Sequence, residues 1–167
     1  AFKVDDWNAD LSPWEAPPVF GNEAFAGGAE ATLKYVVEEL IPQLKGGKDP
    51  ELYIGGYSLA GFFALWAVYQ TEIFSGAAAA SPSVWFPHFT EYMRENEIHT
   101  DAVYLSLGDR EERTRNPVMS KVGASIREAN DLLATSGVDC NLEWNKGNHF
   151  KDPDLRAAKA FAWLMNR

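Results

Sequence analysis

The feature that most constrains the fold is a glycine-rich turn between two apolar segments, within residues 52–69. Residues 52–55 form a short apolar run without polar alternation, which is typical of a buried parallel strand. Residues 59–69 are apolar on every side, which predicts a buried helix. The sequence Gly-Tyr-Ser-Leu-Ala-Gly (56–61) joins them. The segment therefore predicts a strand–turn–helix unit whose small residues let the strand and the helix approach closely.

Ser58 lies at the centre of this turn. A serine hydroxyl is a poor nucleophile unless a base takes its proton and nearby donors stabilise an oxyanion. A strand-to-helix turn lifts the hydroxyl above the sheet and points free N–H groups, here that of Leu59, towards a substrate. The segment matches G-x-S-x-G except that Ala60 replaces the second glycine, and Gly61 supplies further room. We therefore interpret Ser58 as a candidate nucleophile.

Helix and strand patterns alternate along the rest of the chain, which favours an α/β fold with a mostly parallel sheet flanked by helices. An amphipathic helix is expected from Leu33 to Leu44, where Gly46-Gly47 stops it. Further strands are predicted over 74–80, 103–107 and 138–144, and further helices from Asn116-Pro117 and from Asp152-Pro153 to Met165.

Residues 1–30 are rich in Trp, Pro and Gly without periodicity, and an ordered loop is expected there. We find no internal repeat and no linker, so residues 1–167 are interpreted as one domain. Hydrophobic residues make up 46% of the chain and charged residues 23%, which is typical of a globular protein.

The composition excludes several classes of partner. The net charge of −9 argues against binding to nucleic acid or to an anionic membrane, because both favour clusters of Lys and Arg. The single cysteine, Cys140, excludes an internal disulfide and suits a cytoplasmic location. No apolar run is long enough to span a bilayer, and no signal-peptide pattern opens the chain. No metal or cofactor is expected, since Asp152 and Asp154 are explained by helix capping and helix-dipole effects.

His149 is the candidate base among the three histidines. It lies in a turn after the last predicted strand, at the same edge of the sheet as Ser58, because the carboxyl ends of parallel strands meet there. His88 and His99 have no comparable context and are interpreted as surface or packing residues.

A carboxylate is needed to hold the imidazole tautomer and to stabilise the imidazolium. If the sheet is of the α/β-hydrolase type, the chain order is serine, acid, histidine, and the acid is expected in the loop after the 103–107 strand. Asp109, Glu111 and Glu112 all lie in this loop. Asp109 could complete a turn, Glu111 has more reach towards His149, and Glu112 could pair with Arg113 or Arg115. Local reasoning leaves the three carboxylates as alternatives.

Four segments in this order resemble an esterase branch of the α/β-hydrolases that includes enterochelin esterase-like, esterase D-like and feruloyl esterase-like proteins. The resemblance extends over about residues 33–164 and implies an acid three positions after Gly108, which is Glu111, with Asp109 as the alternative. It also implies that Trp85 forms a pocket wall. The segments are Gly-Tyr-Ser-Leu-Ala-Gly (56–61), Ala-Ser-Pro-Ser-Val-Trp (80–85), Leu-Gly-Asp-Arg-Glu-Glu (107–112) and Gly-Asn-His-Phe (147–150).

The same resemblance implies strands ahead of the nucleophile turn and an early loop that supplies an oxyanion donor. Most of the residues before Ser58 belong instead to the Trp/Pro-rich region and one helix, and the opening Ala-Phe-Lys-Val (1–4) is typical of the end of a strand. We therefore expect a hydrolase-type sheet that lacks its N-terminal strands. The N–H of Leu59 is expected to be one oxyanion donor, and the sequence indicates no second one.

These observations predict a serine esterase that cleaves small carboxylic esters through a Ser58–His149–Glu111 triad and an acyl-enzyme. Tyr57, Trp85 and Trp14 are the residues expected to line its substrate pocket. One alternative is a thioesterase or acyltransferase with the same triad. Another is a catalytically silent hydrolase-fold protein that binds a ligand or partner.

Overall fold

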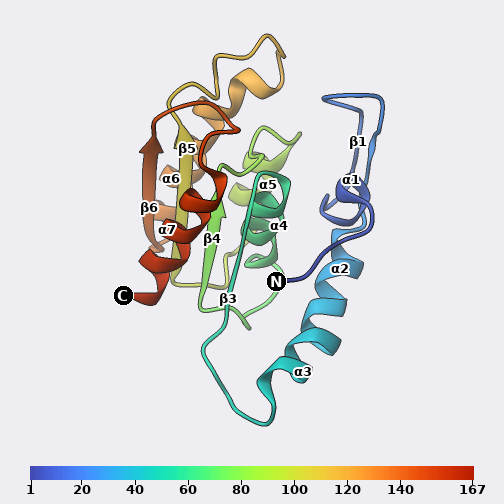
Figure 1. The fold of residues 1–167 in the computed structure, drawn as a ribbon, viewed down its shortest axis with the longest axis vertical. Helices are drawn as coiled ribbons and strands as arrows, with labels where there is room; N and C mark the ends of the chain where they lie inside the picture. Colours follow the sequence, from blue (N-terminus) through green and yellow to red (C-terminus); the bar gives the residue numbers. More distant parts are fainter.

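Four parallel strands form the central sheet of the computed structural model, which describes residues 1–167 (Figure 1). They lie in the order β3-β4-β5-β6, so each strand pairs with the next one along the chain. All four predicted strands and their parallel direction are confirmed, with ends shifted by one or two residues. Their bounds are Tyr53–Tyr57, Gly76–Ala80, Ala102–Gly108 and Asp139–Asn145.

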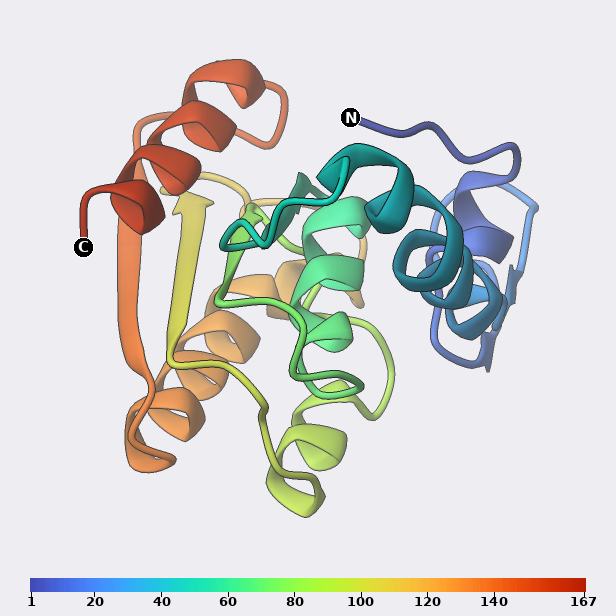
Figure 2. The ribbon, with the colours of Figure 1, turned by 90° about the horizontal axis from the view of Figure 1, so that it is seen from below.

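Helices cover both faces of the sheet (Figure 2). Helices α4 (Leu59–Ala67) and α6 (Val122–Thr135) lie on one face, where Ala77 and Ala79 of β4 belong to the main hydrophobic core. Helix α7 (Pro153–Met165) covers the other face, where Ala78 packs with Leu164. The sequence-based prediction of an α/β fold with a mostly parallel, helix-flanked sheet is therefore confirmed.

Strand β4 reads Gly-Ala-Ala-Ala-Ala and is fully buried between these helices. Because no side chain in it is larger than a methyl group, α4 and α7 approach the sheet closely from opposite faces. The packing leaves no room for a larger residue beside β4. A Cβ added to Gly55 of β3 would lie 2.6 Å from both Ala78 Cβ and Phe161 Cζ, which is too close for any side chain. Helices α4 and α7 begin after the carboxyl ends of β3 and β6, where the candidate residues lie.

The helix expected from Leu33 to Leu44 is present but begins earlier and is uneven. It consists of α2 (Ala29–Tyr35), a π-helical turn (Val36–Leu40) and α3 (Ile41–Lys45). Pro42 lacks the N–H that a regular helix would donate one turn back, which accounts for the wider turn before it. The helix ends at Gly46, whose φ of 54° is left-handed as a glycine stop requires.

Strand β3 departs from the prediction of a buried strand. It is the outermost strand of the sheet, and only Ile54 among its residues is buried. A short apolar run predicts burial but cannot show which strand lies at the edge. The expectation that the hydrolase-type sheet lacks its N-terminal strands is confirmed, because β3, which leads directly into the nucleophile turn, is the first strand of the sheet.

The remaining differences concern short elements. Residues 1–30 contain helix α1 (Trp7–Asp10) and two-residue strands β1 (Glu15–Ala16) and β2 (Phe25–Ala26), which pair antiparallel. Helix α5 (Phe89–Glu95) was not predicted. No helix of the structure combines the length and apolar character that crossing a bilayer requires.

The two predicted caps behave differently. Asn116 Oδ1 accepts hydrogen bonds from the N–H groups of Val118 and Met119, as a cap should, and a 3-10 turn (Met119–Lys121) then leads into α6. Asp152 precedes α7 as expected, but its side chain makes no capping hydrogen bond. Its backbone is left-handed, with φ of 52°, rather than in the extended conformation that is typical of a capping residue.

Candidate active site

Ser58 stands between the end of β3 and the start of α4, in a strained backbone conformation with φ of 60° and ψ of −122°. Its N–H donates to the carbonyl of Ala80 over 3.1 Å, which ties the turn to β4. The small neighbours are required by close approach, because a Cβ on Gly56 would lie 2.6 Å from Ala60 C and one on Gly61 would lie 2.8 Å from Gly56 O. Strain of this kind persists only where the surrounding structure enforces it.

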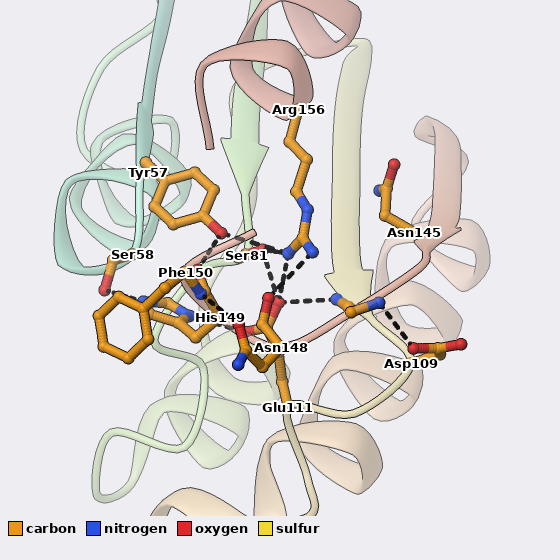
Figure 3. A network of polar contacts seen from close by, with 12 residues as sticks. Tyr57, Ser58, Ser81, Asp109, Glu111, Asn145, Asn148, His149, Phe150 and Arg156 are labelled. Atoms are coloured by element: carbon orange, nitrogen blue, oxygen red, sulfur yellow. Dashed lines mark hydrogen bonds and ion pairs between the residues drawn. The ribbon is translucent and has the colours of Figure 1, made fainter. Parts of the chain in front are cut away.

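A continuous chain of hydrogen bonds starts at this serine (Figure 3). Ser58 Oγ lies 3.0 Å from His149 Nε2, and His149 Nδ1 lies 2.7 Å from Glu111 Oε2. The three residues come from the loops that follow β3, β6 and β5. The structure thus brings together the three side chains that the sequence singled out, although 38 residues separate Glu111 from His149 and 91 separate Ser58 from His149.

Glu111 is held as a carboxylate by an unusually complete set of donors. Its Oε1 accepts from the N–H of Gly108 at 2.7 Å, from Ser81 Oγ at 2.9 Å and from Arg156 Nη1 at 2.7 Å, which leaves Oε2 for His149. Burial raises the pKa of Glu111, but the hydrogen bonds from His149 and Gly108 outweigh it and hold the pKa below its ordinary value of 4.5. The group is therefore ionised at neutral pH.

The two alternative carboxylates point elsewhere. Asp109 is exposed, and its Oδ1 accepts from the N–H of Gly147 at 2.8 Å, so it joins the loops after β5 and β6 without touching His149. Glu112 faces Arg127 of α6 at 3.7 Å rather than Arg113 or Arg115, because the loop turns it towards that helix. Of the three acids, Glu111 alone contacts the imidazole.

Arg156 and Ser81 belong to the site although sequence reasoning assigned neither a role. The Arg156 side chain is only 2% exposed. Its Nη1 contacts Glu111, Ser81 Oγ at 3.0 Å and the Tyr57 hydroxyl at 3.2 Å, and its Nη2 donates to the carbonyl of Asn148 at 3.0 Å. The only sequence signal was a cation in the first turn of the last helix, where a buried and an exposed arginine look alike.

Tyr57, predicted as a pocket residue, contacts the base loop. Its hydroxyl donates to the carbonyl of His149 at 2.6 Å. Burial raises the pKa of Tyr57, so the phenol stays protonated and keeps this bond at neutral pH. On the outer side of His149, the ring of Phe150 lies edge-on at 5.4 Å and is 84% exposed, which leaves an apolar surface beside the candidate nucleophile (Figure 3).

The two predicted pocket tryptophans lie in different places. Trp85 is 9% exposed and lines a small cavity together with Ser81, Glu111 and His149. Trp14 lines a separate groove beside Tyr92, and its Nε1 donates to the carbonyl of Pro87 at 3.0 Å. Trp85 is thus next to the candidate triad, whereas Trp14 is not brought to it.

The other predicted features can be placed as well. The N–H of Leu59 is the first of helix α4 and so has no acceptor within the helix. His88 precedes α5 and His99 precedes β5, and neither takes part in the hydrogen bonds of Ser58. No group of His, Cys, Asp or Glu side chains is arranged to hold a metal ion. A cavity of about 760 Å³ lies at the opposite, amino-terminal end of the strands, where its lining includes Tyr53, Ser75 and Asp101.

Comparison with solved structures identifies the fold. The siderophore hydrolase EstA from Aspergillus nidulans matches with a TM-score of 0.72 at 22% identity over 98% of this chain and 69% of its own. The fold is that of the α/β-hydrolases. An IroE-like serine hydrolase from Shewanella oneidensis matches this hydrolase fold with a TM-score of 0.76 at 17% identity over 95% of this chain and 56% of its own.

The enterobactin esterase FES from Shigella flexneri matches with a TM-score of 0.62 at 18% identity, over 81% of this chain and 39% of its own. The chain therefore spans less than two thirds of the second and third of these structures. No family model and no curated protein sequence matches it. These structural neighbours include proteins of the enterochelin esterase-like branch that the four sequence segments resemble.

Proposed function

We propose that this chain is a serine hydrolase that cleaves carboxylic esters through an acyl-enzyme. The observation that carries the proposal is the unbroken hydrogen-bond chain from Ser58 Oγ through His149 to Glu111, at a strained strand-to-helix turn. The structural neighbours, which are named as esterases or hydrolases, support the same reaction class.

In this mechanism, His149 Nε2 takes the proton of Ser58 Oγ as the oxygen attacks the ester carbonyl. The oxyanion of the tetrahedral intermediate accepts a hydrogen bond from the N–H of Leu59, at the positive end of the α4 dipole. His149 then gives the proton to the leaving alkoxide, and an alcohol departs. Water, activated by the same imidazole, releases the acid and restores Ser58.

Glu111 has a supporting part in each step. Its Oε2 accepts from Nδ1–H, which fixes the tautomer in which Nε2 faces Ser58. As Nε2 gains a proton, the ionised and buried carboxylate stabilises the imidazolium. Because its pKa is held below the ordinary range, Glu111 remains an acceptor well below neutral pH.

The substrate class is proposed from the surface around Ser58 and from the neighbours. The exposed Phe150 ring offers an apolar contact to an acyl or aryl group, and the buried indole of Trp85 lines a small cavity beside His149. Siderophore and enterobactin hydrolysis and ferulic acid esterase activity are named for the neighbours. We accordingly propose small-molecule esters, with enterobactin and a ferulic acid ester as the first compounds to assay.

The decisive experiment is active-site labelling with a fluorophosphonate probe, followed by hydrolysis of p-nitrophenyl acetate. Wild-type protein is expected to react stoichiometrically, whereas Ser58→Ala abolishes labelling and His149→Ala slows it by about 10⁴-fold or more. Ser83→Ala is the matched control, since this serine contacts the turn through its backbone, where its N–H donates to Ser58 O. Wild-type protein that neither labels nor hydrolyses esters would favour the catalytically silent alternative.

A further inference from the structure

We propose that Arg156 is the positioning residue of this site, fixing both the orientation of Glu111 and the loop that carries His149. This inference rests on the hydrolase function proposed above. No sequence pattern pointed to it. It follows from where one buried guanidinium lies and what it contacts.

The guanidinium contacts residues at the carboxyl ends of all four strands. Tyr57 ends β3, Ser81 follows β4 directly, and Glu111 and Asn148 each come three residues after the end of β5 and β6. One side chain from α7 therefore joins the four segments from which the site is built (Figure 3). No other side chain of the network reaches so many of them.

The contact with Glu111 decides which carboxylate oxygen faces the imidazole. Arg156 Nη1 holds Oε1 at 2.7 Å, and Gly108 N–H and Ser81 Oγ converge on the same oxygen. The carboxylate cannot rotate without breaking all three bonds, so Oε2 stays directed at His149 Nδ1. Space is also fitted to this arrangement, because a Cβ on Gly108 would lie 2.9 Å from Arg156 Nη2.

The contact with Asn148 fixes the backbone of the base. Arg156 Nη2 donates to the carbonyl of Asn148, and Tyr57 donates to the carbonyl of His149, so both peptide groups around the imidazole are held. A planar fork with several donors suits this task, whereas a lysine ammonium is a point charge on a flexible stem. The loop also carries Lys146, Asp152 and Lys151, which packs beside Gly147. Asp109 faces it from the loop after β5, where it accepts from Gly147 N–H.

The test replaces the fork while keeping its charge. Arg156→Lys retains a cation beside Glu111, so the protein is expected to fold. We expect kcat for p-nitrophenyl acetate to fall by about 10–100-fold with KM nearly unchanged, because reacting groups are misplaced rather than substrate binding lost. The matched control is Lys159→Arg, on the same helix one turn later, which is expected to keep wild-type kcat.

A second readout does not depend on turnover. The hydrogen bond between His149 Nδ1 and Glu111 gives a downfield proton resonance, which is expected to broaden through faster solvent exchange in Arg156→Lys and to persist in Lys159→Arg. A kinetic double-mutant cycle with Glu111→Gln is expected to be non-additive, with a combined loss smaller than the product of the two single losses.

Three results would overturn the assignment: wild-type kcat in Arg156→Lys, an unchanged Nδ1 resonance, or losses that multiply in the cycle. Failure of the proposed function has a different signature. In that case wild-type protein does not react with the fluorophosphonate, while the resonance still responds to Arg156→Lys.

Discussion

Helix α7 contributes a cation to each of two carboxylate clusters, Arg156 to Glu111 and, one turn later, Lys159 to Glu143. Both clusters include a tyrosine, since Tyr57 contacts Arg156 and Tyr104 donates to Glu143. They differ in burial. The Arg156 and Glu111 side chains are 2% and 5% exposed, whereas those of Lys159 and Glu143 are 41% and 33% exposed.

They differ also in what the second carboxylate oxygen meets. In the buried cluster it meets His149, and through it Ser58, whereas in the exposed cluster it meets a phenol. The same residue types thus form a candidate catalytic cluster in one place and a surface ion pair in the other. Position at the carboxyl ends of the strands, rather than residue composition, therefore distinguishes the candidate catalytic cluster from the surface ion pair.

The largest expected difference between the clusters is in turnover. Glu111→Gln should lower kcat by about 10³–10⁴-fold, because the amide can hold the wrong imidazole tautomer and does not stabilise the imidazolium. Glu143→Gln, the matched control, should leave kcat within about twofold. Steady-state ester hydrolysis checks both. Equal losses in the two variants would remove the distinction between the clusters.

The next largest difference is in stability. Arg156→Met leaves the Glu111 carboxylate buried without its cation and should lower the free energy of unfolding by about 3–5 kcal/mol. Lys159→Met should cost no more than about 1 kcal/mol, because that pair is screened by solvent. Urea denaturation measures both values. A loss below about 1 kcal/mol in Arg156→Met would show that the ion pair between Arg156 and Glu111 does not stabilise the fold.

The clusters should also respond differently to acid. The pKa of Glu111 is lower in the folded than in the unfolded chain, so its stabilising contribution is present above about pH 4.5 and is lost as the pH falls through the lowered value. The pKa of Glu143 is also lowered, against the effect of burial, by hydrogen bonds from Lys159 and Tyr104, but this group is more exposed. The dependence of Tm on pH between pH 3 and 7, measured by thermal unfolding, should therefore be flatter in Glu111→Gln than in Glu143→Gln.

The smallest effect is expected at Asp109, which lies beside the buried cluster but outside it. Asp109→Asn keeps an oxygen that accepts from Gly147 N–H, so kcat should fall by less than about tenfold. The same esterase assay decides this. A loss as large as that of Glu111→Gln would move the acid role to Asp109.

Much of this arrangement was predictable, because it depends on local pattern. The small residues around Ser58, the turn that carries His149 and the positions of the four strands along the chain are all visible in the sequence. A parallel sheet then places these loops at one edge. The choice of Glu111 came from the family resemblance, since local reasoning left Asp109 and Glu112 open. The roles of Ser58, His149 and Glu111, and the cytoplasmic location, stay predictions.

What could not be predicted depends on contacts between distant segments. Arg156 follows Asp-Pro-Asp-Leu, a setting that is equally typical of a solvent-exposed first turn, and only the packing of α7 on the sheet buries it. The edge position of β3 could not be predicted from its apolar composition for the same reason. The placement of Trp14 against Tyr92 and Pro87, rather than beside Ser58, is likewise a contact between segments far apart in the sequence.

The alanine strand β4 has a consequence for how the molecule can change. Its methyl groups set the distance between the layer that carries Ser58 at the start of α4 and the layer that carries Arg156 at the start of α7. The distances between the hydrogen-bonded groups of the site thus depend on side-chain volume in a strand that contributes no side chain to the site. Larger side chains in β4 would move Ser58 away from Arg156 and from the acid and the base loop that Arg156 contacts. The distances within the candidate site therefore limit which residues β4 can contain.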